Sequence, residues 1–336
     1  MTCRRNSSIE LLRLLLMFLI VLGHCIIHGL GLYGISPYSH GTINHIPDSQ
    51  ILFAMIIYCF CTYAVNCFIL ISGYFGINLS KKKFLSLLFA LIFYSIFFNV
   101  LPEIIAGNLQ NAILNALFLS HSPYWFIIDY LFLMVFAPLL NSSFKILTTR
   151  YCCILVIMMG IASCYFGFLW SHPVNTNGYT LFQFIMIYCI GRLIRKTEFN
   201  IRKNKAIILF LVGCVTTGAL MYIVYSSPLT NYTWRMSYYN NPLVIFNAIM
   251  LFYIFLNITI HSKFINSLAS SALAIYLIQS SQWVSNIMYE NIASKSAKIG
   301  GGIWLYINIL SLAIIIFSLL FDKIRIYLSS RFINIG

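Results

Sequence analysis

The chain has 336 residues, of which 60% are hydrophobic, 16% are aromatic and only 8% are charged. Soluble domains carry about 25% charged residues, so this composition excludes a soluble protein and indicates an integral membrane protein. The formal net charge of +14 comes from short basic clusters between apolar stretches. Such clusters determine how a membrane protein is oriented in the bilayer, and they do not form the basic face of a nucleic-acid-binding protein.

Cysteine and histidine do not indicate a disulfide framework or a metal centre. Most of the 10 cysteines lie inside apolar segments without metal-ligand spacing, so we predict that they are small buried apolar residues. Four histidines between the apolar segments lack the short paired spacing of zinc ligands, and we expect no metal; they are His40, His45, His121 and His172.

Ten apolar stretches are candidates for transmembrane helices, because about 20 residues of helix cross the hydrocarbon core. They lie at roughly 8–28, 51–77, 84–105, 124–141, 152–170, 179–195, 206–225, 242–260, 266–289 and 303–321. We therefore predict an all-α, polytopic integral membrane protein, a bundle of about ten transmembrane helices that forms one domain over residues 1–336. Residues 106–123 are expected to form a short surface helix.

The basic residues between these stretches alternate from one side of the membrane to the other. With the N-terminus in the cytoplasm, 17 Lys and Arg fall on the cytoplasmic side, and only Arg235, Lys295 and Lys298 fall on the other. This excess of positive charge predicts a multi-pass protein of the cell (cytoplasmic or inner) membrane with both termini in the cytoplasm.

The first apolar stretch, IELLRLLLMFLIVLGHCIIHGL, carries ionisable side chains that membrane helices rarely contain. Eleven helical steps of about 100° separate Arg13 from His24, so both lie on one face, roughly 16 Å apart along the axis. Glu10 lies on the same face, about one turn before Arg13, and is its expected partner. An arginine at the bilayer centre costs about 2.5–3.5 kcal/mol on insertion scales, so this stripe is a candidate functional site.

Two interpretations of this stripe stay open. In the functional one, Arg13 contacts an anionic group from the cytosol, and His24 is a general base at neutral pH. In the structural one, Arg13 extends to the lipid headgroups and His24 is a hydrogen-bonded packing residue. The presence of Glu10, Arg13 and His24 on one face favours the functional interpretation.

The second span ends in CFILISGYFGINLSKKKF. Ser72 and the glycine after it allow close helix approach, and Tyr74 adds a hydroxyl near the cytoplasmic end, which packing and an interfacial tyrosine also explain. The following lysines anchor the chain at lipid phosphates or meet the phosphates of a nucleotide-bearing donor; they are Lys81, Lys82 and Lys83.

The fourth span, SPYWFIIDYLFLMVFAPLLN, carries Asp129 about 7 Å inside its aromatic start. A buried acid needs a partner or a proton. His24 and His28 are the nearest candidates in depth, so Asp129 either orients the base or binds a hydroxyl, or else it is an acid reached by water. Packing hydrogen bonds are expected for three further amides in the spans, Asn66, Asn99 and Gln279.

Several segments together resemble the membrane-bound acyltransferase 3 family. They are the pair Arg13-x10-His24 after the acidic IELLR start, ISGYF at the end of the second span, PYWFIIDYLFLMVFAPLL in the fourth and SSALAIYLIQ in the ninth. The number of spans and the topology with both ends inside also match, so the resemblance covers nearly the whole chain.

The resemblance implies a membrane enzyme that O-acylates cell-surface polysaccharides and related glycans. It implies that His24 is the catalytic histidine, and that Arg13 is needed for acyl-CoA binding or for active-site structure. Ser72 and Tyr74 would belong to the family's SGY/F element. Two departures stand out: Gln279 occupies a position that is histidine in many relatives, and a lysine run replaces the arginines that often follow the second span.

We therefore predict an O-acyltransferase that moves an acyl group, expected to be acetyl from acetyl-CoA, to a sugar hydroxyl of a surface polysaccharide or lipid-linked glycan. Its partners would be the glycan acceptor, the acyl-CoA and the lipid bilayer, without nucleic acid and without a metal. The alternative is a transporter or polymerase of lipid-linked glycans. The short exterior loops of this chain argue against that alternative. A proton-coupled carrier that uses the Glu10–Arg13–His24 stripe as a relay is a third interpretation.

Overall fold

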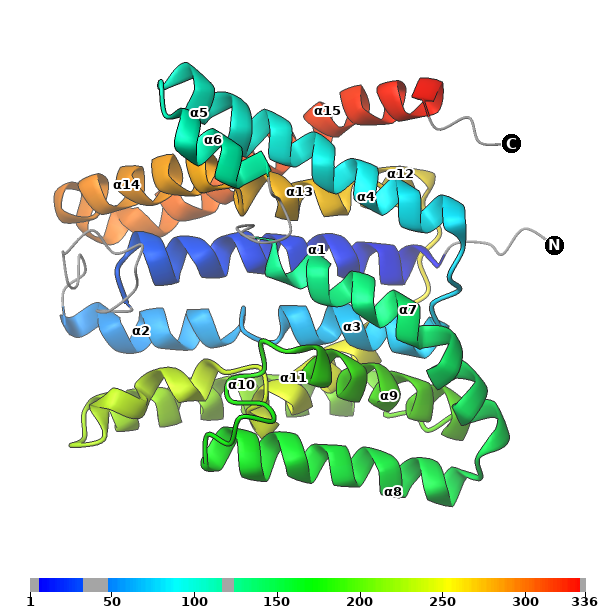
Figure 1. Cartoon of the computed structure of the whole chain (residues 1–336). Helices are drawn as coiled ribbons and strands as arrows, with labels where there is room; N and C mark the ends of the chain where they lie inside the picture. The colour runs from blue at the N-terminus through cyan, green and yellow to red at the C-terminus, as the bar shows by residue number, and fades with distance from the viewer. Residues whose placement is uncertain (1–5, 33–47, 117–123, 333–336) are drawn as a thin grey trace. The chain divides into compact units, whose positions relative to one another are not determined.

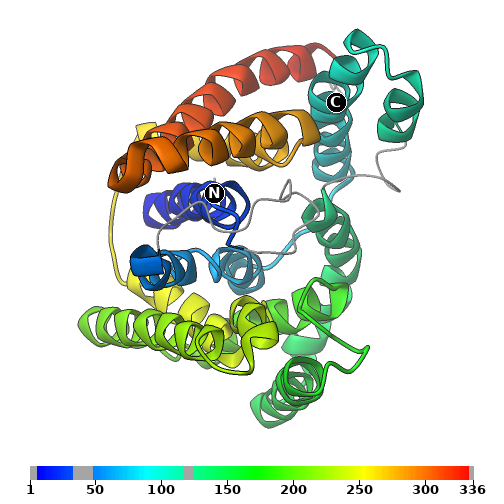
Figure 2. The same cartoon turned by 90° about the vertical axis from the view of Figure 1, so that its left-hand side faces the viewer.

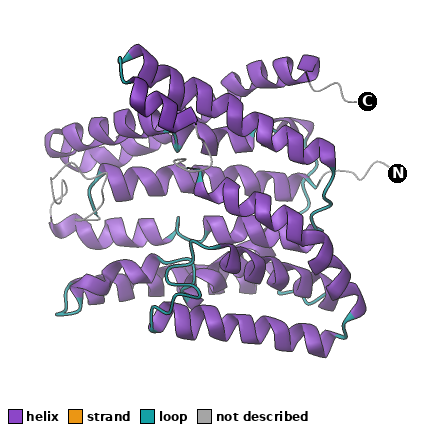
Figure 3. Ribbon diagram, viewed as in Figure 1, coloured by secondary structure: helices purple, strands orange, loops and turns teal. Residues whose placement is uncertain are grey.

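The computed structural model describes residues 6–32, 48–116 and 124–332, and every regular element in these ranges is a helix (Figure 3). In the described part of the chain, eight helical stretches are long and apolar enough to cross a membrane, which confirms an all-α polytopic membrane protein. They are Ser7–Gly29, Gln50–Phe75, Lys81–Ile105, Trp125–Ile146, Thr149–Leu169, Lys203–Tyr225, Thr230–Leu256 and Gly300–Ser329.

The other two predicted spans are shorter or interrupted helices. Residues 179–195 correspond to α9 (Leu181–Thr197), which has 17 residues. Residues 266–289 are divided into three helices, α12 (Lys263–Ala269), α13 (Ala272–Gln279) and α14 (Gln282–Ile299). Of the predicted surface helix, α6 (Leu109–Ala116) is present, and residues 117–123 lie outside the described ranges.

The chain divides into two compact units, and each is described by itself. The first unit comprises residues 1–19, 48–79 and 129–263, and the second comprises residues 20–47, 80–128 and 264–336. Three helices contribute residues to both units: α1 (Ser7–His24), α7 (Trp125–Ile146) and α12, the last only through Lys263. That the whole chain forms one domain therefore stays a prediction.

In the first unit, α3 (Ala64–Phe75) packs against α9 and α11 (Pro242–Leu256). The long α10 (Lys203–Tyr225) lies beside α11 in both views (Figures 1 and 2) and also packs against α2 and the 3-10 helix η4. The remaining elements of this unit are α2 (Asp48–Cys59), α8 (Thr149–Gly160), the π-helix η3 (Ile161–Leu169) and η4 (Thr230–Ser237).

The contact between α3 and α9 depends on two glycines. A Cβ at Gly73 would collide with the backbone carbonyl of Tyr188, and a Cβ at Gly191 would lie 2.5 Å from the backbone oxygen of Leu70. The glycine after Ser72 therefore does permit close helix approach, as the sequence suggests. Gly76, with φ +78°, then ends α3, because this backbone conformation is unfavourable for other residues.

In the second unit, α13 packs against α4 (Lys81–Ser95) and α15 (Ile303–Phe332), and α14 packs against the π-helix η1 (Cys25–Gly29) that follows α1. The other elements are η2 (Ile96–Val100), α5 (Leu101–Ile105), α6 and η5 (Gly300–Gly302). A fully buried carboxylate, Asp322, holds α15 to α4: it accepts a hydrogen bond from the Tyr94 hydroxyl at 2.6 Å and pairs with Arg325.

Candidate functional site

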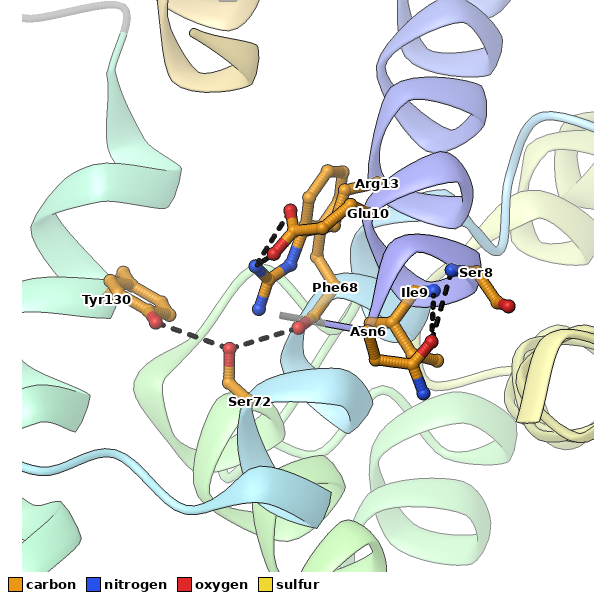
Figure 4. Close-up of polar contacts among 8 residues, drawn as sticks. All are labelled: Asn6, Ser8, Ile9, Glu10, Arg13, Phe68, Ser72 and Tyr130. Atoms are coloured by element: carbon orange, nitrogen blue, oxygen red, sulfur yellow. Dashed lines mark hydrogen bonds and ion pairs between the residues drawn. The ribbon is translucent and has the colours of Figure 1, made fainter. Parts of the chain in front are cut away.

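Hydrogen bonds to the chain just after α11 fix the beginning of α1. Asn6 Oδ1 caps the helix by accepting from the backbone N–H of Ser8 at 3.1 Å (Figure 4). The Ser8 hydroxyl donates to the carbonyl of Ile258 at 2.6 Å and accepts from the N–H of Ile260 at 3.0 Å. These bonds therefore fix the rotation of the first turns of α1 about the helix axis. That rotation determines the direction in which the ionisable side chains of α1 point.

The predicted pair of Glu10 and Arg13 is present on α1. Arg13 Nη1 donates to Glu10 Oε1 at 3.1 Å and to Oε2 at 3.3 Å. The Glu10 side chain is 10% exposed and the Arg13 side chain 35% exposed. Within the described ranges, no partner is found for the other guanidinium nitrogens. The ion pair thus offsets the charge of Arg13 while most of its N–H groups stay available.

Two hydroxyls face the same region of the first unit. Ser72 Oγ, on α3, donates to the carbonyl of Phe68 at 3.1 Å and lies 3.2 Å from the Tyr130 hydroxyl of α7. Figure 4 shows the Arg13 guanidinium directed away from α1 toward these two hydroxyls. We call Glu10, Arg13, Ser72 and Tyr130 the Arg13 cluster. It combines a cation with two neutral hydroxyls, and the guanidinium is suited to a phosphate or a carboxylate.

Asp129 directly precedes Tyr130 on α7. Its side chain is half-buried, and no hydrogen-bond partner is found for it within residues 6–32, 48–116 and 124–332. The predicted role of Asp129, to orient His24 or to bind a hydroxyl, stays a prediction.

The contacts of Tyr74 are with residues outside the Arg13 cluster. Arg195 of α9 donates from Nη1 to the Tyr74 hydroxyl at 3.3 Å, and its guanidinium carbon is 5.3 Å from the centre of the tyrosine ring. Both side chains line a cavity of about 260 Å³, together with Ile194, Glu198, Phe199, Asn200 and Leu256. Tyr74 thus has a cation partner that the sequence did not indicate.

The lysine run begins α4 in the second unit. Lys81, Lys82 and Lys83 are exposed in the first turn, and the Ser80 hydroxyl caps the helix by accepting from the backbone N–H of Lys83 at 3.3 Å. Exposure fits either of the two predicted roles, contact with lipid phosphates or with a soluble donor.

His24 is the last residue of α1, and the chain continues there as the π-helix η1. Single π-turns in α-helices are frequent at functional sites. The half-buried His24 ring presents Nδ1 to the amide of Gln279, at 3.0 Å from Oε1 and 2.9 Å from Nε2. No partner of His24 Nε2 is found in the described part of the chain. One ring nitrogen is therefore engaged and the other is available for chemistry.

Gln279 is held in place on both sides. The Tyr124 hydroxyl donates to the backbone carbonyl of Leu277 at 2.9 Å, and Asn99 donates to Tyr124 at 2.9 Å. Asn99 Oδ1 also accepts from the backbone N–H of Gln282 at 3.0 Å, just beyond the interruption between α13 and α14. The packing hydrogen bonds predicted for Asn99 and Gln279 are thus found, and together they fix the segment that faces His24.

His28 extends this site by one turn. Its ring centre lies 5.7 Å from that of His24 and 5.1 Å from that of Tyr289 on α14. The π-helix is packed tightly here, because a Cβ at Gly29 would lie 2.7 Å from the side chain of Ile292. We call His24, His28, Gln279 and Ser280 the His24 cluster.

No metal-binding group of three or more His, Cys, Asp or Glu is found among the residues that the structure describes. His172 is exposed, and its Nδ1 accepts from the backbone N–H of Val174 at 3.2 Å. His40, His45 and His121 lie outside the described ranges.

Sequence reasoning found the ionisable residues of these clusters but missed their neutral partners. Tyr130 and Ser280 were not singled out, and Gln279 was not connected with His24. A glutamine at the end of an apolar run is a signal of a buried contact, but its partner is 255 residues away in the sequence. Only a structure or a resemblance identifies partners at that separation.

The comparisons with known proteins agree with this architecture. The family described as Acyltransferase domain, the acyltransferase 3 family, matches residues 6–322. The comparisons with curated proteins and with solved structures give no match. Because the family match covers nearly the whole chain, including both clusters, this polytopic membrane protein belongs to the acyltransferase 3 family and is an acyltransferase.

Proposed function

We propose that this acyltransferase moves an acetyl group from acetyl-CoA to a hydroxyl of a cell-surface polysaccharide or lipid-linked sugar. The observation that carries the proposal is the state of His24, in which Gln279 engages Nδ1 and leaves Nε2 without a protein partner in the described chain. A histidine in this state is suited to take a proton from an alcohol near neutral pH.

The reaction needs one proton transfer and one bond exchange. His24 Nε2 takes the proton of the acceptor hydroxyl, whose oxygen attacks the thioester carbonyl. The carbon–sulfur bond then breaks, and the imidazolium returns the proton to the leaving thiolate, so that the products are the O-acetyl ester and free CoA. A relay in which His24 itself carries the acetyl group uses the same nitrogen. Asp129 is proposed to bind a hydroxyl or to orient the base.

Donor recognition is proposed for the Arg13 cluster. CoA carries phosphates, and a guanidinium recognises phosphate through paired N–H donors. The single-nitrogen pairing of Arg13 with Glu10 leaves such donors available, and Ser72 and Tyr130 add hydroxyls. Tyr74 with Arg195, and the lysine run, are further candidate contacts for the phosphates. No metal is invoked in any step.

The charge distribution supports an orientation for this reaction. With both termini in the cytoplasm of a cell (cytoplasmic or inner) membrane, Arg13 lies toward the cytosolic donor and His24 toward the side where surface glycans are exposed. α1 carries both residues in one uninterrupted helix, which spaces them by about 16 Å.

The test is His24→Ala, assayed for transfer of labelled acetyl from acetyl-CoA to the host's surface glycan. Loss of a general base lowers the rate by about 10²–10⁴-fold. The matched control is His261→Ala, because His261 is exposed and lies in neither cluster. Full activity of His24→Ala at equal protein level would refute the proposal.

The same strains separate the transferase from a transporter or polymerase. Surface glycan from a strain lacking the protein is analysed by NMR. We expect the acetyl signals to disappear while the chain length stays the same; loss of the polymer itself would instead support the alternative.

A further inference from the structure

His24 and Gln279 meet where two helices end, α1 at the histidine and α13 at the glutamine. Gln279 is fully buried, and both atoms of its amide lie within 3.0 Å of His24 Nδ1. We propose that Gln279 is a positioning residue that keeps the hydrogen of neutral His24 on Nδ1 and so makes Nε2 the reacting nitrogen. This inference rests on the proposed role of His24 as the base.

Two hydrogen bonds are possible between His24 Nδ1 and the Gln279 amide, and they have opposite consequences for Nε2. A neutral ring has one N–H and one lone pair. If Nδ1 donates to Gln279 Oε1, the lone pair lies on Nε2, which can then accept a proton. If the amide instead donates to Nδ1, the hydrogen lies on Nε2 and the base is lost.

Ser280 is the other hydrogen-bond partner of the Gln279 amide. The Gln279 amide nitrogen donates to the Ser280 hydroxyl at 2.6 Å, which is shorter than either contact with the histidine ring. This bond uses one of the two N–H groups of the amide, while Oε1 lies 3.0 Å from Nδ1. The serine thereby contacts the amide that faces the ring and is the second positioning residue of the proposal, which acts through Gln279.

The contact also suits both protonation states of the reaction. After Nε2 takes a proton, the imidazolium still donates from Nδ1 to the same oxygen, so nothing needs to rotate. Catalytic triads achieve this orientation with a carboxylate, but an ionised acid is costly within a membrane. A neutral amide orients the ring without that cost.

Fixed surroundings make the orientation effective. The backbone on either side of Gln279 is tied by the Tyr124 hydroxyl to Leu277 and by Asn99 to Gln282. These bonds hold the backbone from which the Gln279 side chain extends toward the ring. A supported backbone of this kind is what a positioning residue requires.

The first test measures the tautomer of His24 directly. In 15N-histidine-labelled protein, the His24 signals are assigned by their loss in His24→Ala. We expect unprotonated Nε2 and protonated Nδ1 in the wild type, and a shift toward protonated Nε2 in Gln279→Leu. The matched control is Gln282→Leu, since the Gln282 side chain contacts Asn286. A wild-type hydrogen on Nε2, or the same tautomer in Gln279→Leu, would overturn the proposal.

The second test is kinetic. We expect Gln279→Leu to lower kcat by about 10–100-fold, as loss of such orienting partners does in metal sites, with KM for acetyl-CoA changed less than twofold. The isosteric Gln279→Glu keeps the acceptor oxygen and adds charge that stabilises the imidazolium, so the acidic limb of its pH–rate profile moves to higher pH. An unchanged profile and an unchanged kcat in these variants would contradict the inference.

The two tests separate this inference from the proposed function. Activity of His24→Ala would refute the role of His24 as the base, whatever its tautomer. An inactive His24→Ala together with unaltered Gln279 variants would retain that role and reject Gln279 as its positioning residue.

Discussion

Two arginines of this chain pair with acids three residues away. The two ion pairs differ in how many guanidinium nitrogens they occupy, and this difference distinguishes a structural ion pair from one that can still bind a ligand. Arg325 uses Nε and Nη2 against the two oxygens of Asp322, whose side chain is 1% exposed. Arg13 uses Nη1 alone, and its side chain is 35% exposed. The first arrangement occupies the fork of the guanidinium, whereas the second leaves the fork available to a ligand.

If Arg13 recognises donor phosphates, then Arg13→Lys keeps the charge but removes the paired donors. We expect KM for acetyl-CoA to rise by about tenfold, which corresponds to roughly 1.4 kcal/mol of binding, with a smaller effect on kcat. The measurement is steady-state kinetics in detergent micelles. The matched control, Arg150→Lys at the exposed start of α8, should leave KM unchanged. Equal KM values for the two variants would exclude a specific role of the Arg13 fork.

Among the elements, α3 and α9 form a contact that depends on small residues. Their backbones approach so closely that Gly191 lies against Leu70, Gly73 and Tyr74. The same end of α3 carries Ser72 and Tyr74, so this contact also sets the position of two candidate site residues. Close approach between membrane helices gives van der Waals contact that larger residues would prevent.

We expect Gly191→Ala to destabilise the protein by about 1–3 kcal/mol, because the new methyl group meets backbone atoms that cannot move independently. A Cβ there would lie 2.7 Å from the backbone nitrogen of Tyr74. Thermal melting in detergent micelles measures the loss. Gly160→Ala on α8 is the control, since nothing lies within 4 Å of its new Cβ. A melting temperature of Gly191→Ala equal to that of the control would contradict this account of the α3–α9 contact.

For the whole molecule, the charge distribution makes the sharpest prediction. With 17 Lys and Arg on one side and three on the other, we expect both termini in the cytoplasm. Reporter proteins fused to either terminus, active only in the cytoplasm or only outside it, measure this. Cytoplasmic reporters should be active at both ends and exported reporters at neither. Opposite locations of the two termini would mean an odd number of crossings and would refute the predicted topology.

Much of the molecule follows from its sequence. Composition alone requires a membrane protein, because 8% charged residues cannot cover a soluble surface. The apolar stretches predict an all-α bundle, and the three-residue spacing of Glu10 and Arg13 predicts their ion pair, since local helix geometry brings such residues together. The Arg13-x10-His24 pair and the accompanying segments indicate the acyltransferase 3 family, which the family match confirms.

The tertiary structure decided what depends on contacts between distant segments. Hydropathy alone predicts that residues 266–289 form one span. It does not show that the helix is interrupted at Ser280 and Ser281, just before the Gln282 N–H that donates to Asn99. It likewise cannot pair His24 with Gln279 or Ser72 with Tyr130. Periodicity reports which face of a helix a residue occupies, but the partner on that face is set by packing across the fold. The sequence therefore determined the ionisable groups, and the structure decided which neutral groups orient them.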